Sequence, residues 1–159
     1  ADEDKIKQVL LNILQNSLDA LPRNGSIKVS TNFTDNLSEF RRKVKLNPNS
    51  VFFSFTSPFL KNLNNMQYFV IKISDNGTGV SAEKISHIFE PFFTNKDKGT
   101  GLGLAMVYRI IKDHEGGIYI ESKEGVGTDF YISLPLNRTN TNTVVNSLPK
   151  TEALKMVEE

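Results

Sequence analysis

The sequence of 159 residues contains no cysteine and no tryptophan, and its only histidines are His87 and His114. Without cysteine the chain can form no disulfide, use no thiolate as a nucleophile and hold no metal through sulfur, which fits a reducing compartment. The sequence also lacks an apolar run long enough to cross a bilayer, and it has no signal-peptide pattern. We therefore expect no direct membrane contact from these residues.

The chain has no strong charge of either sign, because 19 Lys and Arg balance 18 Asp and Glu to a net charge of +1. Such a balance gives no general attraction to nucleic acid, so no nucleic-acid partner is expected. A hydrophobic content of 38% is ordinary for a globular domain. The apolar pattern starts within the first residues, which predicts a fragment of a larger protein. We expect one domain over residues 1–137 and an Asn/Thr-rich linker or tail over 138–159.

Hydrophobic periodicity predicts the main elements. Apolar residues at three- and four-residue steps, Leu18 among them, predict an amphipathic helix over residues 2–21 that Pro22 ends. Strands are expected over 26–33, 51–55 and 67–74, followed by a hairpin of 118–122 and 129–134 with a glycine turn at 123–128. Short helices are expected near Leu37 and after Ser81, and a longer one after Gly103 that ends at 114–117.

A polar stripe runs along the first predicted helix. Gln8, Asn12, Asn16 and Asp19 are four, four and three residues apart, so they lie on one side of the helix. Asparagine is a mediocre helix former, and a solvated helix face usually carries Lys and Glu rather than two Asn. The stripe is therefore either a solvated face or one wall of a polar site.

Nine of the ten glycines fall between Gly77 and Gly127, and the densest group closes the stretch 89–104, FEPFFTNKDKGTGLGL. A glycine-rich loop that opens a helix suits phosphate, because backbone N–H groups can approach the oxygens and the helix N-terminus adds positive potential. Lys96 and Lys98 lie just upstream and could reach the same phosphates. Alone, such a loop is a weak indication of nucleotide binding.

Two further features change that reading. The buried strand over 67–74 runs into Asp75-x-Gly77-x-Gly79. A buried carboxylate can accept a hydrogen bond from an exocyclic amine such as that of adenine, and the glycines let a flat ring approach the backbone. A side-chain amide oxygen, as in the Asn stripe, is a hard ligand suited to Mg²⁺. Together the three elements point to a Mg-nucleotide site.

Four motifs in this order carry a family resemblance: QVLLNILQNS at 8–17, DNGTG at 75–79, FEPFF at 89–93 and GTGLGL at 99–104, with a closing glycine turn at 125–128. They resemble the N, first glycine, F and second glycine boxes of the catalytic ATP-binding domain of bacterial sensor histidine kinases. The superfamily is shared with gyrase, heat-shock chaperones and mismatch-repair ATPases. Over residues 2–136 the resemblance implies an α/β (α+β) two-layer sandwich, the Bergerat ATP-binding fold, with helices on one face of a mixed β-sheet and an ATP lid.

The resemblance also implies roles for residues. Asn16 would coordinate Mg²⁺, Asn12 would support the phosphates and Lys96 would contact them, which makes these three the catalytic set. Asp75 would read adenine. The implied ATP-binding set is Asn16, Asp19, Asp75, Gly77, Gly79, Val80, Phe89, Phe93, Lys96, Gly99, Thr100, Gly101, Leu102, Gly103, Leu104 and Thr128. The rings of Phe89, Phe92 and Phe93 would anchor the lid or dock on a dimerisation domain, or simply pack in the core.

The implied function is a protein-histidine kinase with ATP and Mg²⁺ as cofactors. Its phosphoryl acceptor would be a histidine on the protein's own dimerisation domain, absent here, and a response regulator would follow. The expected location is cytoplasmic, as the intracellular part of a membrane-anchored sensor. The sequence departs from the family in a long connection over 34–66 and in having no acceptor helix, because Gly116-Gly117 directly follow His114-Glu115.

Three alternatives stay open. The first is a clamp or chaperone ATPase of the same superfamily. Such enzymes place a carboxylate four residues before the Mg-binding Asn to activate water, whereas Asn12 stands there and cannot act as a base. The second is a nucleotide-binding module without catalysis. The third is a serine-kinase anti-sigma factor, which uses a related fold.

Overall fold

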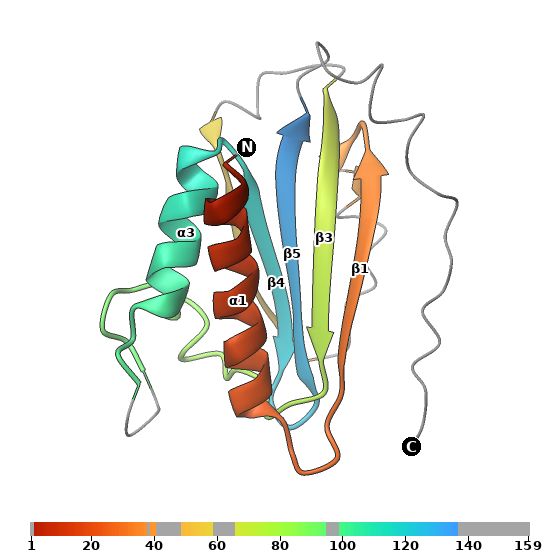
Figure 1. Cartoon of the computed structure of the whole chain (residues 1–159). Helices are drawn as coiled ribbons and strands as arrows, with labels where there is room; N and C mark the ends of the chain where they lie inside the picture. Colours follow the sequence, from red (N-terminus) through yellow and green to blue (C-terminus); the bar gives the residue numbers. More distant parts are fainter. Residues whose placement is uncertain (1, 38, 41–48, 59–65, 95–98, 137–159) are drawn as a thin grey trace, which may run out of the picture.

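The computed structural model describes residues 2–37, 39–40, 49–58, 66–94 and 99–136. Five strands form one sheet in the order β1-β3-β5-β4-β2, and two helices lie side by side on one face of it (Figure 1). The strands are β1 (Ile27–Thr34), β2 (Val51–Thr56), β3 (Gln67–Asp75), β4 (Gly117–Lys123) and β5 (Gly127–Leu136), and the helices are α1 (Glu3–Ala20) and α3 (Gly103–Asp113). The predicted two-layer α+β sandwich is confirmed.

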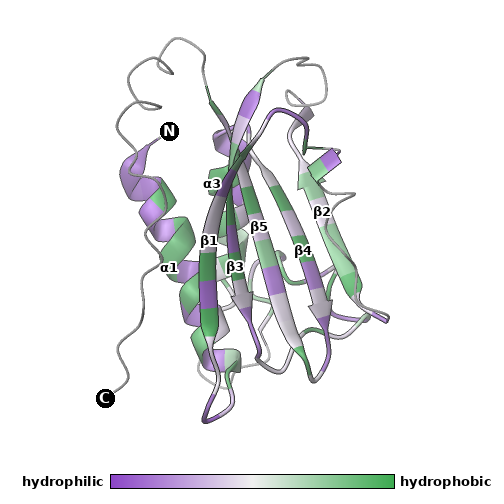
Figure 2. Cartoon of the chain, turned by 90° about the vertical axis from the view of Figure 1, so that its right-hand side faces the viewer, coloured by the Kyte–Doolittle hydropathy of each residue, from purple (hydrophilic) through white to green (hydrophobic). Residues whose placement is uncertain are grey.

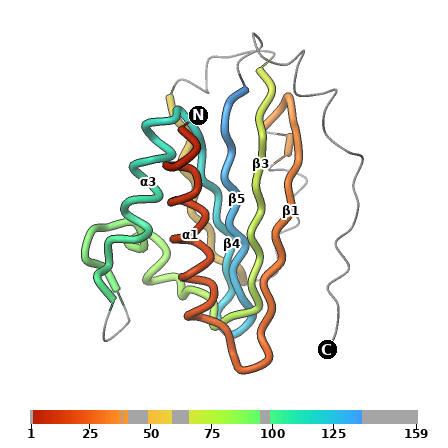
Figure 3. The backbone as a smooth tube through the Cα atoms, in the orientation of Figure 1, coloured from red at the N-terminus to blue at the C-terminus, as the bar shows by residue number. Residues whose placement is uncertain are grey.

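The prediction of a mixed sheet is wrong for the strands described. Each of the four pairings, β1 with β3, β3 with β5, β5 with β4 and β4 with β2, is antiparallel. A tight hairpin joins β4 to β5, and β3 runs opposite to both of its neighbours, so no described pair needs a parallel crossover. The tube in Figure 3 shows the same path, with α1 and α3 to the left of the sheet.

Helix α1 begins where predicted because Asp2 caps it. The Asp2 side chain accepts hydrogen bonds from the backbone N–H groups of Asp4 and Lys5 at 3.1 and 3.2 Å. Val9, Ile13 and Ser17 follow one another at four-residue steps and are buried against the sheet. Leu18 lies outside this buried face and is 56% exposed, although the periodicity had placed it on the apolar face.

Helix α3 ends as predicted at His114-Glu115-Gly116. Glu115 adopts a left-handed φ of 56°, and the Gly116 N–H donates to the Ile111 carbonyl at 2.9 Å. The His114 ring links both helices, since its Nδ1–H donates to the Ile110 carbonyl at 2.8 Å and its Nε2 accepts from the Asp2 N–H at 3.0 Å. A hydrogen-bonded link of this kind fits a structural role for His114.

The connection between β1 and β3 supplies the strand at the opposite edge of the sheet. Figure 2 shows β1 at one edge and β2 at the other. Phe40 lies on the face away from the helices, where its ring meets that of Tyr131 edge-on at 6.1 Å. Tyr131 points to that face because its neighbours Phe130 and Ile132 belong to the core under the helices. Part of the 34–66 connection is thus built into the fold.

The face away from the helices also carries a polar cluster around Tyr131. Lys72 Nζ lies 2.8 Å from Asp129 Oδ2 and 5.1 Å from the centre of the Tyr131 ring. Burial opposes the charge on Lys72, but its hydrogen bonds to Asp129 and Tyr131 outweigh burial and raise its pKa. Burial raises the pKa of Tyr131 and of Tyr68. This cluster links β3 to β5 on the side of the sheet opposite the helices.

Two predicted helices differ from the structure. Residues 81–89 form successive turns, because most of their hydrogen bonds span three residues, as from the Lys84 N–H to the Ser81 carbonyl at 3.1 Å. A helix does begin at Leu37, but its predicted continuation to Val44 lies outside the described residues, as does the 138–159 tail.

Among the residues described, no helix combines the length and apolarity that a membrane crossing requires.

Candidate functional site

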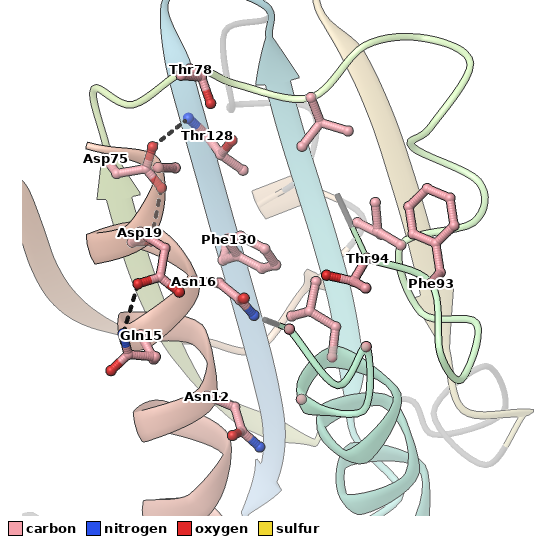
Figure 4. Close-up of a pocket in the computed structure, with 18 of the residues that line it drawn as sticks. Asn12, Gln15, Asn16, Asp19, Asp75, Thr78, Phe93, Thr94, Thr128 and Phe130 are labelled. Carbon is pink, nitrogen blue, oxygen red and sulfur yellow. Dashed lines mark hydrogen bonds between the residues drawn. The ribbon is translucent and has the colours of Figure 1, made fainter. Parts of the chain in front are cut away.

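A cavity of about 790 Å³ lies between α1, the end of β3 and the start of α3. Figure 4 shows Asn12 and Asn16 on α1 facing α3, Asp75 and Thr128 at one end, and Phe93 and Thr94 on the opposite side. The lining consists of Asn12, Gln15, Asn16, Ser17, Asp19, Ala20, Asp75, Thr78, Gly79, Val80, Ile88, Phe93, Thr94, Gly99, Thr100, Gly101, Gly103, Leu104, Thr128 and Phe130. It is the meeting point of the polar stripe and both glycine loops.

The Asp75 carboxylate is held by three donors. Its Oδ1 accepts from the backbone N–H groups of Gly77 at 3.0 Å and Thr128 at 3.2 Å. Its Oδ2 accepts from the Ser17 hydroxyl at 2.8 Å, and Ser17 is only 2% exposed. An ionised carboxylate has about four acceptor sites, so one site on Oδ2 is left for a ligand donor.

Close backbone contact at the Asp75 end requires two glycines. Gly79 has a φ of +68°, and a Cβ added there would lie 2.1 Å from the Lys123 carbonyl oxygen. Gly127 has a φ of +140°, and a Cβ there would lie 2.0 Å from the Asp75 carbonyl oxygen. The β4–β5 turn therefore packs directly against the loop that follows β3.

Ser122 fixes that contact from inside. Its buried hydroxyl accepts from the Val80 N–H at 2.8 Å, donates to the Gly127 carbonyl at 3.0 Å and lies 2.8 Å from the Thr128 hydroxyl. One side chain thus ties the loop after β3 to the turn that opens β5. Sequence reasoning missed Ser122 because a serine in a strand gives no signal of its partners.

The start of α3 faces the Asn stripe across the cavity. A Cβ added at Gly103 would lie 3.7 Å from Asn12 Oδ1 and 3.9 Å from Asn16 Nδ2. Leu102, the residue before the helix, makes no side-chain capping hydrogen bond. The residue at this position usually caps the first N–H groups of a helix with its side chain, and Leu102 does not. The uncapped start of α3 therefore favours an anionic ligand.

A hydrogen bond from the Phe92 N–H to the Gly101 carbonyl at 2.9 Å anchors the loop before α3. Gly101 has a φ of +66°, and a Cβ there would lie 2.4 Å from the carbonyl carbon of Phe92. Phe92 itself has a φ of 69° and is 75% exposed. Glycine at 101 is thus what lets the two ends of this loop meet.

Most of the predicted binding residues line the cavity. Three do not: Gly77 lies beside it and donates to Asp75, Leu102 is 42% exposed, and Phe89 is buried. The ring of Phe89 packs against Phe53 and Tyr108 behind the wall, which agrees with the core-packing alternative for this residue. Lys96 lies outside the described residues. Lining residues that sequence reasoning missed are Gln15, Ser17, Ala20, Thr78, Ile88, Thr94 and Phe130.

Some of these omissions had a signal in the sequence. Gln15 is one turn before Asp19, and its amide donates to the Asp19 carboxylate at 2.8 Å. Ser17 follows Asn16 but belongs to the buried face of α1, where a hydroxyl needs a partner. Phe130 alternates into the core in β5 and had no distinguishing signal.

Fold and cavity together define an α+β domain with a polar site between a helix layer and glycine loops. The chain belongs to the family described as histidine kinase-, DNA gyrase B-, and HSP90-like ATPase, which matches residues 1–138. Its structure is similar to the catalytic domain of histidine kinase ThkA, with a TM-score of 0.57 and 30% identity over 85% of this chain and 68% of that one. The resemblance to histidine kinase catalytic domains is confirmed.

Curated relatives are sensor kinases. The chain is 32% identical over 137 residues to sporulation kinase E of Bacillus subtilis (strain 168), covering 86% of this chain and 14% of that protein. It is 35% identical over 139 residues to the sensor histidine kinase ZraS of Escherichia coli (strain K12), covering 87% and 23%. The chain thus spans less than a quarter of either relative. Full-length ShkA in complex with AMPPNP shares the fold alone, at 22% identity and a TM-score of 0.57 over 85% of this chain and 22% of that one.

Proposed function

We propose that this chain is the Mg-ATP-binding catalytic domain of a sensor histidine kinase. It would donate the γ-phosphoryl group of ATP to a histidine on the protein's own dimerisation domain, from which a response regulator receives it. The observation that carries the proposal is the two-ended cavity, with the Asp75 carboxylate at one end and the start of α3 facing Asn12 and Asn16 at the other.

The Asp75 end suits adenine. Three protein donors occupy three acceptor sites of the carboxylate, and the free site on Oδ2 matches the exocyclic amine of adenine. Gly79 keeps the neighbouring backbone free of a side chain, so a flat ring can lie beside it. Thr128 and Val80 close this end of the cavity.

The α3 end suits a triphosphate with Mg²⁺. Backbone N–H groups at Gly101 to Gly103 and the helix N-terminus would hold the phosphate oxygens. Asn16 offers a hard oxygen ligand. The described residues hold no group of three or more His, Cys, Asp or Glu for a metal, which fits an ion that takes most ligands from phosphate and water. Bound Mg²⁺ would neutralise charge on the phosphates.

Transfer is favoured over hydrolysis by the residue at position 12. Asn12 lines the cavity one helical turn from Asn16, where a clamp ATPase of this family would have a carboxylate. An amide has no basic lone pair with which to activate water. Catalysis would then rest on positioning the reacting groups and on neutralising charge on the phosphates. Both assist phosphoryl transfer to any well-placed acceptor.

The test is to mix the domain with a separately made dimerisation domain that carries the acceptor histidine. We expect an acid-labile, base-stable phosphoprotein, while the domain alone binds ATP and hydrolyses it very slowly. Asn16→Asp adds a charge beside the phosphates and should lower transfer. Asn12→Glu restores the carboxylate a hydrolase would use and serves as the matched variant for hydrolysis. Rapid ATP turnover by the unmodified domain without phosphohistidine would overturn the kinase proposal in favour of a clamp ATPase.

A further inference from the structure

Strand β2 presents two phenylalanine rings to the helix side of the sheet. Phe53 meets Phe89 with ring centroids 4.7 Å apart, and Phe55 meets Tyr108 at 4.7 Å. Phe89 and Tyr108 in turn lie 5.7 Å apart. The four rings form a continuous aromatic cluster that joins β2 to the turns of 81–89 and to α3.

The two aromatic residues that Phe53 and Phe55 contact, Phe89 and Tyr108, belong to the segments that form one wall of the cavity. Phe89 lies between the lining residues Ile88 and Phe93 in the chain. Tyr108 follows the lining residue Leu104 by one turn of α3, so its position sets that of the start of the helix. The Asp75 end of the cavity, by contrast, is built by β3, α1 and the β4–β5 turn.

The strand that holds this wall comes from the long connection between β1 and β3. It enters the sheet at the edge beside β4 and is separated in the chain from every element it supports. Phe53 and Phe55 thus lie outside the four sequence motifs, whereas Phe89, which Phe53 contacts, is the first residue of the motif at 89–93.

We propose that β2 is a positioning element for the phosphate end of the nucleotide site. Phe53 holds Phe89 and Phe55 holds Tyr108, and together they fix the 88–94 segment against the start of α3. The inference rests on the proposed ATP-binding function and assigns a role to the part of the 34–66 connection that forms β2. If one of these rings is made smaller, the residue that it contacts should shift, and the shift should reach the cavity wall, because a packed core has few alternative arrangements.

The experiment compares Phe53→Leu with Phe52→Leu. Phe52 is the preceding residue of the same strand, points to the other face and is 60% exposed, so it is a matched control. Affinity for ATP is measured by calorimetry, affinity for adenosine by NMR titration, and folding by the melting temperature. We expect Phe53→Leu to weaken ATP binding about fivefold and adenosine binding less than twofold, and Phe52→Leu to change neither.

Adenosine lacks the phosphates, so the ratio of the two affinities separates positioning from general destabilisation, which would weaken both ligands alike. If Phe53→Leu melts below the assay temperature, Phe55→Leu, which acts through Tyr108, gives the same comparison. Unchanged ATP affinity, or equal loss for ATP and adenosine, in the folded variant would overturn the role of β2. An unmodified chain that binds neither ligand would refute the proposed function instead.

Discussion

Replacing Asp75 with asparagine should reverse the purine preference of the site. Two backbone donors, Gly77 N–H and Thr128 N–H, point at Oδ1, so the amide oxygen of the substituted side chain must take that position. The amide nitrogen then replaces Oδ2, beside the Ser17 hydroxyl and the ligand. The Ser17 hydroxyl can turn and accept a hydrogen bond. The site would therefore present an N–H where the native protein presents an acceptor.

The magnitude follows from the bond that is lost. A hydrogen bond to a charged group contributes roughly 1.5–3 kcal/mol, so Asp75→Asn should weaken ATP binding by about tenfold to a hundredfold. Inosine triphosphate carries an oxygen in place of the exocyclic amine of ATP. It should bind the variant more tightly than it binds the native chain, because its oxygen accepts from the new N–H.

Calorimetry with both nucleotides on both proteins measures the effect, with Ser17→Ala as the control. Ser17→Ala removes one support of the carboxylate without changing what Oδ2 offers, so it should lower both affinities modestly and keep the preference for ATP. If Asp75→Asn weakened both nucleotides equally, the carboxylate would serve only to hold the loop. That result would refute the adenine-reading role.

Two further predictions concern the backbone. Gly127→Ala should lower the midpoint of urea unfolding far more than Gly125→Ala. Both glycines have positive φ, but only the Cβ added at Gly127 meets another atom, the Asp75 carbonyl oxygen at 2.0 Å. An equal fall in the midpoint for both variants would contradict this contact. Glu115→Gly should raise the stability by about 1 kcal/mol in the same assay, since it relieves a left-handed residue at the end of α3; a lower midpoint would count against this strain.

Local signals in the sequence were sufficient for most of the helices and strands and for most of the residues that line the cavity. The cap at Asp2, the periodicity of α1 and the glycine turn before β5 act over a few residues, so each could be assigned without knowing the rest. The same holds for the motifs around Asp75 and Gly101, whose special backbone shapes need glycine.

What the sequence could not predict depends on contacts between distant segments. Nothing in the residues 51–56 says that they pair with β4 rather than with β1 or β3, and this choice places β2 at the far edge. The same applies to Ser17 and Asp75, which are 58 residues apart yet share a hydrogen bond. Phe89 could be read as a ligand contact or as core, and only its neighbours decide.

The position of β2 has a consequence for synthesis of the protein. β2 leaves the ribosome before β4, its only strand partner among the described pairings, and the two are separated by β3 and α3. Its six residues, VFFSFT, include three phenylalanines and no charge, a composition that favours β-aggregation when unpaired. During translation this segment must wait until β3, α3 and then β4 itself have emerged. Among the described strands, β2 is therefore the one that a nascent-chain chaperone would be expected to shield.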